Sequence, residues 1–285
     1  MISGILNVLK PAGLTSNAVL TEIKKKLKPH KIGHLGTLDP SGTGVLPVCI
    51  NKATKLFDYY LKKDKHYRAI FVFGKETDTI DSDGKVLRVD NKEICAGDIE
   101  KILTKFVGKQ SQMPPQYSAK KVNGCKAYEL ARRGCEFELK PKDIIIYDIK
   151  LVAQIKENTF LFDIKCSSGT YIRSLCRDLA DCLNTVGYMA AIIRTESGSF
   201  NINDSVKLDE LTENDIIPLK KVLEDKKKMF ISDEFYDKII NGCEIKVNSD
   251  DCDECVVFCK DELIGIGHIK SNTLKIDVNL WEKHD

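Results

Sequence analysis

The chain has 285 residues, of which 42% are hydrophobic, and its 44 Lys and Arg residues nearly balance its 42 Asp and Glu residues. This composition is typical of a globular protein. No apolar run approaches the roughly 18 residues of a membrane span, and the first residues lack the charged and long apolar regions of a signal peptide. Eleven cysteines, scattered from Cys49 to Cys259, fit reduced thiols better than a disulfide framework, so we expect a cytoplasmic protein.

The small net charge hides an asymmetry along the chain. Residues 1–75 carry 13 basic and 4 acidic side chains, whereas residues 201–285 carry 12 basic and 20 acidic ones. A basic N-terminal segment indicates a nucleic-acid or phosphate partner. Charge alone leaves a solvated, Lys-rich surface equally open.

Apolar periodicity and turn residues predict a mixture of strands and helices. In chain order these are a strand over 4–9, a turn at 11–13, a helix over 17–27, a glycine-rich loop over 33–44, a strand over 45–50, a helix over 53–61, strands over 66–74 and 85–89, a helix over 96–107, strands over 143–154 and 159–166, a helix over 171–182 and a strand over 188–195. Strands joined by turns outnumber strand-helix-strand units. This favours an α+β fold with a mixed, mostly antiparallel sheet.

Two local signals refine these elements. Ser16 precedes the first predicted helix and can cap it. Asp83-Gly84 predicts a hairpin between the strand that contains Tyr67 and the strand over 85–89. Residues 204–228 are expected to form a connection, and residues 229–285 a small β-rich module.

The most informative stretch is the loop GHLGTLDPSGTG over residues 33–44. Its four glycines allow close approach of the backbone to a ligand. Asp39 stands before Pro40, which presents the carboxylate at the apex of the loop, although an Asp-Pro pair often only caps a turn. No Lys-Ser or Lys-Thr follows the glycines, so a nucleotide-triphosphate site is not indicated.

Five blocks resemble the TruB family of tRNA pseudouridine synthases. The run GHLGTLDPSGTGVLPV is similar to the family's catalytic pattern GH-x-G-x-LDP-x-x-x-G-x-LP. The other blocks are Lys65-His66-Tyr67 with Gly74, Thr77-Asp78-Thr79 and Asp81; Gln112-Met113-Pro114-Pro115 with Tyr117-Ser118-Ala119 and 121–124; SGTYIRSL over 168–175; and Arg194-Thr195 with Ser197-Gly198. They occur in family order over residues 3–200.

The resemblance implies isomerisation of the uridine at position 55, in the T loop of tRNA, to pseudouridine without a metal or organic cofactor. Asp39 would be the catalytic carboxylate and would act on a flipped-out base. Whether it forms a covalent adduct or removes a ribose proton to give a glycal is left open.

The same resemblance assigns further site residues. Arg173 would pair with Asp39, because a guanidinium favours an ionised carboxylate and can orient it bidentately; a surface ion pair is the alternative. Tyr67 would stack on the detached base and relay the C5 proton, unless it is only a core aromatic. Tyr171 would lie beside the carboxylate, and Ile192 stands where the family usually has a Leu under the uracil.

Other residues are expected to contact RNA. His34, which has no Cys or His at metal-ligand spacing, would lie at the RNA-facing edge of the loop and fill the space that the flipped base leaves. A Lys cluster before the loop, and a basic insertion near 110–140 that would close on the RNA, could contact phosphate or could be solvated surface. These basic residues include Lys24, Lys25, Lys26, Lys28 and Lys31, and then Lys120, Lys121, Lys126, Arg132 and Arg133.

Two metal-like patterns are rejected. Asp78, Asp81 and Asp83 lack the spacing and terminal Glu of an EF-hand calcium loop. The thiols of Cys252, Cys255 and Cys259 have no second C-x-x-C to complete a zinc site.

We therefore predict a catalytic domain over 1–225, with a pseudouridine synthase fold, and a small β-rich, PUA-like domain over 229–285. The expected partner is tRNA, without a membrane or an obligate protein partner. Two alternatives remain: a guide-RNA-dependent relative that acts on ribosomal RNA, and an RNA-binding chaperone that folds tRNA with catalysis secondary. The joint presence of Asp39, Tyr67 and Arg173 favours an enzyme.

Overall fold

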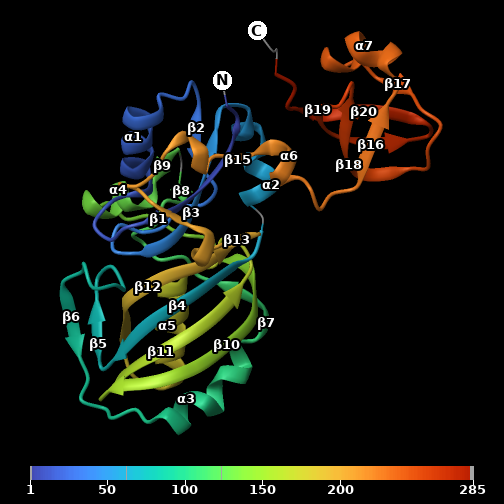
Figure 1. The fold of residues 1–285 in the computed structure, drawn as a ribbon. Coiled ribbons are helices and arrows are strands. Elements are labelled where there is room, and N and C mark those ends of the chain that lie inside the picture. The colour runs from blue at the N-terminus through green and yellow to red at the C-terminus, as the bar shows by residue number, and fades with distance from the viewer. Residues whose placement is uncertain (1, 62, 123, 283–285) are drawn as a thin grey trace.

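A computed structural model describes residues 2–61, 63–122 and 124–282, and two β-sheets organise the fold (Figure 1). In the described residues the larger sheet has eleven strands, with a main order of β14-β1-β3-β12-β4-β11-β10-β7, and the smaller has five, in the order β16-β18-β19-β20-β17. Strand pairs are antiparallel except for β1 with β14, β3 with β12, and β16 with β18. The predicted mixed, mostly antiparallel α+β fold is confirmed.

The strands of the larger sheet are β1 (Gly4–Lys10), β2 (Ile32–His34), β3 (Thr43–Ile50), β4 (Lys65–Phe73), β7 (Gly108–Gln112), β10 (Lys142–Lys156), β11 (Thr159–Cys166), β12 (Gly187–Ser197), β13 (Phe200–Asn201), β14 (Val206–Lys207) and β15 (Ile217–Pro218). Two separate hairpins pair β5 (Lys75–Thr77) with β6 (Val86–Val89) and β8 (Lys121–Val122) with β9 (Cys125–Lys126). The smaller sheet contains β16 (Lys228–Ile231), β17 (Ile245–Lys246), β18 (Cys252–Cys259), β19 (Glu262–Lys270) and β20 (Thr273–Asn279).

The helices are α1 (Ser16–Leu27), α2 (Phe57–Leu61), α3 (Ala96–Leu103), α4 (Ala127–Arg132), α5 (Ile172–Cys182), α6 (Leu219–Val222) and α7 (Tyr236–Ile240), with 3-10 turns at Asn51–Leu56, Thr104–Phe106, Ile202–Asp204, Glu213–Asp215 and Asp233–Phe235. The helix expected over 53–61 is therefore a 3-10 turn followed by α2. Within the described part of the chain, none of the helices combines the length and apolar character that crossing a membrane requires.

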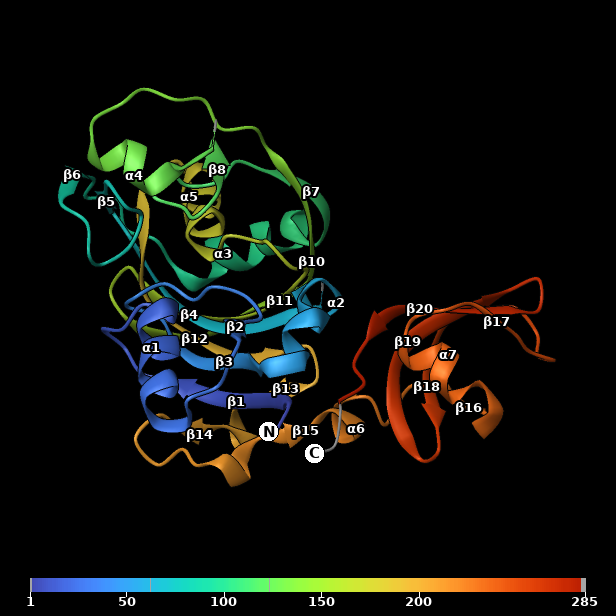
Figure 2. The same ribbon diagram turned by 90° about the horizontal axis from the view of Figure 1, so that it is seen from above.

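One face of the larger sheet holds the main core. Alternate residues of β4, from Lys65 through Phe71 to Phe73, are buried on this face, as period-two alternation requires. Helices α3 and α5 cover it, as Figure 2 shows. Phe71 and Phe162 pack there with ring centroids 4.7 Å apart. On the opposite face, which is towards the viewer in Figure 1, the described residues place no helix over β4, β10 and β11.

The prediction that Ser16 caps α1 is wrong. The hydroxyl of Thr15 accepts the hydrogen bond from Ala18 N at 3.0 Å, which is the capping contact. Ser16 is buried instead, and its hydroxyl both accepts from Leu38 N at 2.9 Å and donates to Leu38 O at 3.0 Å. The first turn of α1 is thereby attached to the loop that carries Asp39.

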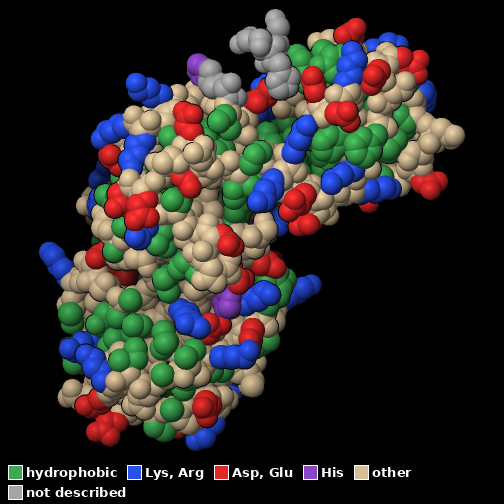
Figure 3. Space-filling model, viewed as in Figure 1, with side chains coloured by type: hydrophobic (Ala, Val, Ile, Leu, Met, Phe, Trp, Pro, Cys, Tyr) green, Lys and Arg blue, Asp and Glu red, His purple; other side chains and the backbone are tan. Residues whose placement is uncertain are grey.

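The predicted hairpin at Asp83-Gly84 forms, but with a different first strand. Strand β6 pairs with β5 and not with β4, because β12 and β11 already occupy both edges of β4. The hairpin projects from the sheet and leaves Val86, Leu87 and Val89 exposed. Figure 3 shows hydrophobic side chains over this lower left part of the molecule.

The C-terminal module packs against the larger domain through a shared core. Val256, Phe258 and Leu280 of the module belong to the same buried cluster as Leu56 and Tyr60. Polar contacts surround this cluster, including Tyr59 Oη donating to Glu254 Oε1 at 3.0 Å and Lys55 Nζ donating to Asn279 O at 2.7 Å. A buried apolar cluster and the polar contacts around it therefore join the two units.

Candidate active site

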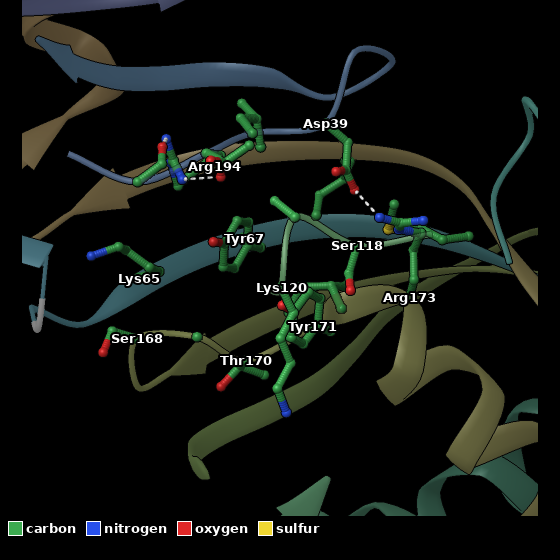
Figure 4. Close-up of a pocket in the computed structure, with 18 of the residues that line it drawn as sticks. Asp39, Lys65, Tyr67, Ser118, Lys120, Ser168, Thr170, Tyr171, Arg173 and Arg194 are labelled. Carbon is green, nitrogen blue, oxygen red and sulfur yellow. Dashed lines mark hydrogen bonds and ion pairs between the residues drawn. The ribbon is translucent and has the colours of Figure 1, made fainter. Parts of the chain in front are cut away.

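A pocket of about 620 Å³ opens beside the glycine-rich loop, where that loop meets β4, β12 and the start of α5 (Figure 4). The described residues that line it include six that the sequence singled out: Asp39, Tyr67, Lys120, Tyr171, Arg173 and Ile192. These residues lie far apart in the sequence. The fold therefore brings residues from all five resembling blocks to one cavity.

Asp39 and Arg173 face one another in this pocket, as Figure 4 shows. Arg173 Nη2 lies 3.0 Å from Asp39 Oδ2. The Arg173 side chain is 7% exposed, whereas the Asp39 side chain is 36% exposed. The buried cation thus stabilises a carboxylate that a substrate can reach.

Arg173 pairs with another acidic side chain as well as with Asp39. Its Nη1 lies 3.3 Å from Oδ2 of a second carboxylate, Asp81, whose side chain is only 8% exposed. Nη1 and Nη2 also donate to the carbonyls of Thr79 and Tyr117, each at 3.0 Å. One guanidinium therefore bridges two carboxylates and fixes two backbone segments, because its planar fork has donors in several directions.

Asp81 is bound tightly in its buried position. Its Oδ1 accepts hydrogen bonds from Thr79 Oγ1 and, at 3.1 Å, from Asp83 N. Burial raises the pKa of Asp81, although the Thr79 hydroxyl and the Arg173 charge oppose this effect. Asp81 is thus a buried partner of Arg173 behind the exposed carboxylate.

Lys10 supports the glycine-rich loop through its backbone carbonyls. This fully buried residue at the end of β1 donates to the carbonyls of Pro11 at 2.9 Å, Pro40 at 3.1 Å and Gly42 at 2.6 Å. Burial lowers the pKa of Lys10 to about 8; the negative charge of Asp39 opposes that shift and the Arg194 charge adds to it. The ammonium holds the loop backbone that directly follows Asp39.

Arg194 supports the other arm of the loop and is almost completely buried. It donates to the carbonyls of Val45 at 2.7 Å, Gly36 at 3.1 Å and Thr37 at 3.3 Å. Gly44 has φ +105°, and a Cβ there would clash with the Arg194 carbonyl oxygen and lie 2.8 Å from Arg194 N. Only glycine allows the loop to approach β12 this closely.

Tyr67 lies centrally in the pocket (Figure 4) and is buried. Burial raises the pKa of its phenol, while the Arg194 charge acts in the opposite direction. Leu38, Met189 and Ile192 line the same cavity and belong to one buried cluster with Tyr67. The pocket thus offers an apolar surface of a kind that suits a planar base.

Tyr171 is positioned by an amide pair. Gln112 Nε2 donates to Tyr171 O at 3.1 Å, and Tyr171 N donates to Gln112 Oε1 at 2.8 Å. This fixes the residue immediately before α5, two positions ahead of Arg173. Burial raises the pKa of the Tyr171 phenol.

The predicted RNA-contacting residues fall into two groups. Lys120 lines the pocket, and its Nζ donates to Lys140 O at 2.5 Å. His34, Lys24, Lys25, Lys121 and Arg132 do not line it. Lys25 pairs with Glu22 at 2.7 Å, and the Arg132 guanidinium lies 5.8 Å from the Tyr128 ring centroid.

His34 is half-buried in β2, and its Nδ1 has no hydrogen-bond partner among the described residues. Burial, together with the Arg194 charge, lowers the pKa of His34. Its ring is therefore uncharged at neutral pH, a form that can enter a base stack.

The two rejected metal patterns have other contacts. Asp78 Oδ1 accepts from Lys85 N at 2.8 Å, and Asp81 faces Arg173. Cys255 and Cys259 are buried free thiols, and Cys252 is partly exposed. In the described ranges, three or more His, Cys, Asp or Glu side chains do not converge as metal ligands.

Four residues that hold the site were not assigned to it from the sequence: Lys10, Asp81, Gln112 and Arg194. Asp81, Gln112 and Arg194 stand within the resembling blocks, so the signal for them was present. Lys10 carried a weaker signal, namely a Lys that ends an apolar strand directly before Pro11.

Comparison with known families matches two consecutive parts of the chain. The model described as TruB family pseudouridylate synthase (N terminal domain) matches residues 24–172, more than half of the chain, and the model described as tRNA pseudouridylate synthase B C-terminal domain matches residues 173–244. The chain belongs to the TruB family. The resemblance noted in the sequence is thereby confirmed.

Curated TruB relatives match over most of their length. Proteins named tRNA pseudouridine synthase B are 36% identical in Alkaliphilus oremlandii, over 95% of this chain and 94% of the relative, and 41% identical in Clostridium novyi, over 97% and 99%. The Bacillus subtilis protein of the same name is 40% identical over 85% of this chain and 83% of the relative.

Solved structures share the fold of this TruB family member. An H/ACA ribonucleoprotein bound to a substrate RNA containing 2'-deoxyuridine has a TM-score of 0.72 and 23% identity, and covers 98% of this chain and 85% of that one. A Cbf5-Nop10-Gar1 complex has a TM-score of 0.71 and 25% identity over 97% and 84%. The predicted fold, with a PUA-like C-terminal module, is confirmed.

Proposed function

We propose that this protein isomerises the uridine at position 55, in the T loop of tRNA, to pseudouridine, with Asp39 as the catalytic carboxylate. The observation that carries the proposal is the exposed Asp39 carboxylate, held 3.0 Å from the buried Arg173 in a pocket with an apolar floor. Membership of the TruB family and relatives named tRNA pseudouridine synthase B support the same activity.

The reaction breaks the bond between N1 of uracil and C1' of ribose, turns the base and joins C5 to C1'. The proton on C5 leaves, and N1 gains a proton, so the product is an isomer of the substrate. Asp39 acts at this centre, either as a nucleophile that forms an adduct or as a base that removes a ribose proton. Arg173 keeps the carboxylate oriented, because a buried guanidinium between two carboxylates has little freedom to move.

Tyr67 holds the detached base. Since burial raises the pKa of its phenol, the ring is neutral at physiological pH and can stack on uracil. Its hydroxyl can then pass on the C5 proton by donating and accepting hydrogen bonds. Confining the base between Tyr67 and Ile192 keeps C5 close to C1', which is the entropic part of catalysis.

The uridine reaches Asp39 only after it leaves the base stack, which costs a few kcal/mol. His34, at the edge of the loop, supplies a neutral ring to fill the vacated space, and Tyr171 packs beside the carboxylate. Lys24, Lys25, Lys121 and Arg132 contact phosphates outside the pocket, and Lys120 does so at its rim.

We infer that residues 1–225 form the catalytic domain, including the RNA-contacting insertion near 110–140, and that residues 229–285 form the PUA-like domain. The protein acts on tRNA in the cytoplasm without a guide RNA or an obligate protein partner. The tRNA pseudouridine synthase B names of relatives at 36–42% identity favour this over the guide-RNA-dependent alternative.

The deciding experiment compares wild type with Asp39→Asn on an unmodified tRNA transcript, in the absence of other proteins and RNAs. We expect wild type to form pseudouridine at position 55. The variant, which keeps the shape of Asp39 without its charge, should be slower by roughly 10³-fold or more. Chemical mapping of pseudouridine gives the readout.

Binding of the same transcript separates the enzyme from the chaperone. We expect Asp39→Asn to bind tRNA about as tightly as wild type, because phosphate contacts dominate affinity. No product at position 55 with wild type, or full activity in the variant, would refute the proposed function.

A further inference from the structure

A second pocket, of about 710 Å³, adjoins the reaction pocket and shares Lys142 and Ser168 with it. It lies at the edge of the larger sheet, where β7 pairs with β10. Lys109 and Ser111 contribute further hydrogen-bond donors, and among the described residues Asp143 is the acidic one that lines it. The two pockets therefore form one path from the reacting carboxylate to the sheet edge.

Lys142 stands at the junction of the two pockets. It is the exposed first residue of β10, and its Nζ lies 3.4 Å from the carbonyl oxygen of Ser168. No carboxylate of a described residue pairs with Lys142 or Lys109 within 4.0 Å, in contrast to Lys150 on the same strand, which lies 2.6 Å from Asp148. Lys142 thus presents an unneutralised charge at the mouth of the reaction pocket.

Gly169 makes this position possible. The residue has φ +78°, and a Cβ there would overlap Lys142 Nζ and lie 2.9 Å from Lys142 Cε. The loop beneath is held in place because Ile145 N donates to Ser167 Oγ and Ser167 N donates to Ile145 O, both at 2.8 Å. A rigid loop with a glycine at this point sets where the ammonium lies.

A nucleotide that enters a pocket base first leaves its flanking phosphates at the pocket mouth. We propose that Lys142 binds a phosphate that flanks the flipped uridine, and that the second pocket takes the adjoining stretch of the RNA strand, with Lys109 facing the next phosphate. This inference rests on the proposed function, since it names how the same site grips its RNA.

The test uses Lys142→Met, which keeps the aliphatic stem and removes the charge, on an unmodified tRNA transcript. We expect KM to rise about tenfold with kcat within about twofold of wild type, because a phosphate contact made before and during the reaction contributes uniform binding. The plot of log Kd against log salt should flatten by about 0.7 to 0.9.

Two matched variants act as controls. Lys142→Arg keeps the charge and should hold KM within about threefold of wild type. Lys150→Met removes a paired charge in the middle of β10 and should change neither KM nor the salt slope. Gly169→Ala displaces the Lys142 ammonium without removing it and should raise KM, while a thermal melt checks folding.

A neutral methylphosphonate at one linkage beside the target uridine identifies the phosphate. It should weaken binding to wild type about tenfold at the linkage that Lys142 contacts, and cause no further loss in Lys142→Met. A folded Lys142→Met enzyme with wild-type KM and salt slope would overturn the inference. Absence of pseudouridine with wild type would refute the proposed function instead.

Discussion

At the residue scale, Arg173 explains why two carboxylates can share one site. Asp39 and Asp81 both lie within 3.3 Å of its guanidinium, but only Asp39 is open to a substrate. The buried Asp81 neutralises part of the Arg173 charge and fixes the plane of the guanidinium. The Arg173 guanidinium that faces Asp39 is therefore already oriented before the reaction. Less reorganisation of this charged group is then needed as the reaction proceeds.

Lys10 offers a prediction about pH at the same scale. Its pKa of about 8 lies below the ordinary 10.5 because of burial. Below pH 8 the ammonium is charged in both the folded and unfolded chain. Between pH 8 and 10.5 the folded chain has released this proton and the unfolded chain still holds it, so this residue raises the free energy of unfolding as pH rises.

We therefore expect the free energy of unfolding of wild type, relative to that of Lys10→Met, to increase between pH 8 and pH 10 by up to about 1.4 kcal/mol per pH unit. Urea unfolding of both proteins at several pH values measures this difference. Burial also lowers the pKa of Lys65 to about 8. Because Lys65 is present in both proteins, its contribution to the pH dependence cancels in the difference. A difference that stays constant from pH 7 to pH 10 would show that Lys10 titrates alike in both states.

At the element scale, the parallel contact between β3 and β12 aligns the catalytic loop with the pocket floor. Ile193 pairs with Thr43 and Arg194 with Gly44 in this contact. β3 follows the loop, and β12 carries Ile192 and Arg194. The carboxylate and the apolar floor are thus positioned by two strands in one sheet, and rigid elements hold a site more accurately than loops do.

Gly44→Ala should disrupt this contact. The new Cβ would collide with backbone atoms of Arg194 at a residue with φ +105°, so we expect the free energy of unfolding to fall by about 2 to 4 kcal/mol. Gly33→Ala is the matched control, because a Cβ there meets nothing within 4 Å. Urea unfolding compares the variants, and equal stability of the two would mean that β3 and β12 need not approach closely.

At the scale of the whole molecule, the charge asymmetry corresponds to the two structural units. The basic N-terminal segment includes α1, the catalytic loop and β4, and the acidic C-terminal segment includes the module of β16 to β20. The module is fixed to the catalytic domain by the shared core around Leu56 and Phe258. We therefore expect most phosphate contacts to lie on the catalytic domain.

Within the Lys run of α1, the ammonium groups differ in their contacts. Lys25 pairs with Glu22, and Lys26 donates to the carbonyls of Leu208 and Asp209. The Lys24 side chain makes no such contact with a described residue, so its charge is available for phosphate. Lys24→Gln should therefore flatten the dependence of log Kd on log salt for tRNA by about 0.7 to 0.9. Lys275→Gln, which removes a charge paired with Glu244 at 3.1 Å on the C-terminal module, should leave the slope unchanged. An equal slope in all three proteins would place Lys24 outside the RNA footprint.

The local sequence determined many of the strands of this protein and the residues of its catalytic loop. Runs rich in apolar, aromatic and β-branched residues predicted β4, β10, β11 and β12 to within a few residues, because such side chains suit the half-buried surface of a sheet. The run around Asp39, and the pairing of Asp39 with Arg173, were likewise predicted from short blocks. Local chemistry sufficed for the strands because each depends on neighbours in the chain. The pairing of Asp39 with Arg173, which lie far apart in the sequence, was predicted only from the family resemblance.

Only the tertiary structure decided how the loop is held. Lys10, Ser16 and Arg194 come from three elements, β1, α1 and β12, and all of them bind backbone carbonyl or amide groups of the loop. Main-chain groups are the same at every residue, so no sequence pattern reveals which of them a buried side chain will meet. The same reason explains why Thr15 caps α1 while Ser16 binds Leu38. The bridge that Arg173 makes between Asp39 and Asp81 was also decided by the tertiary structure, because Arg173 lies far from both carboxylates in the sequence.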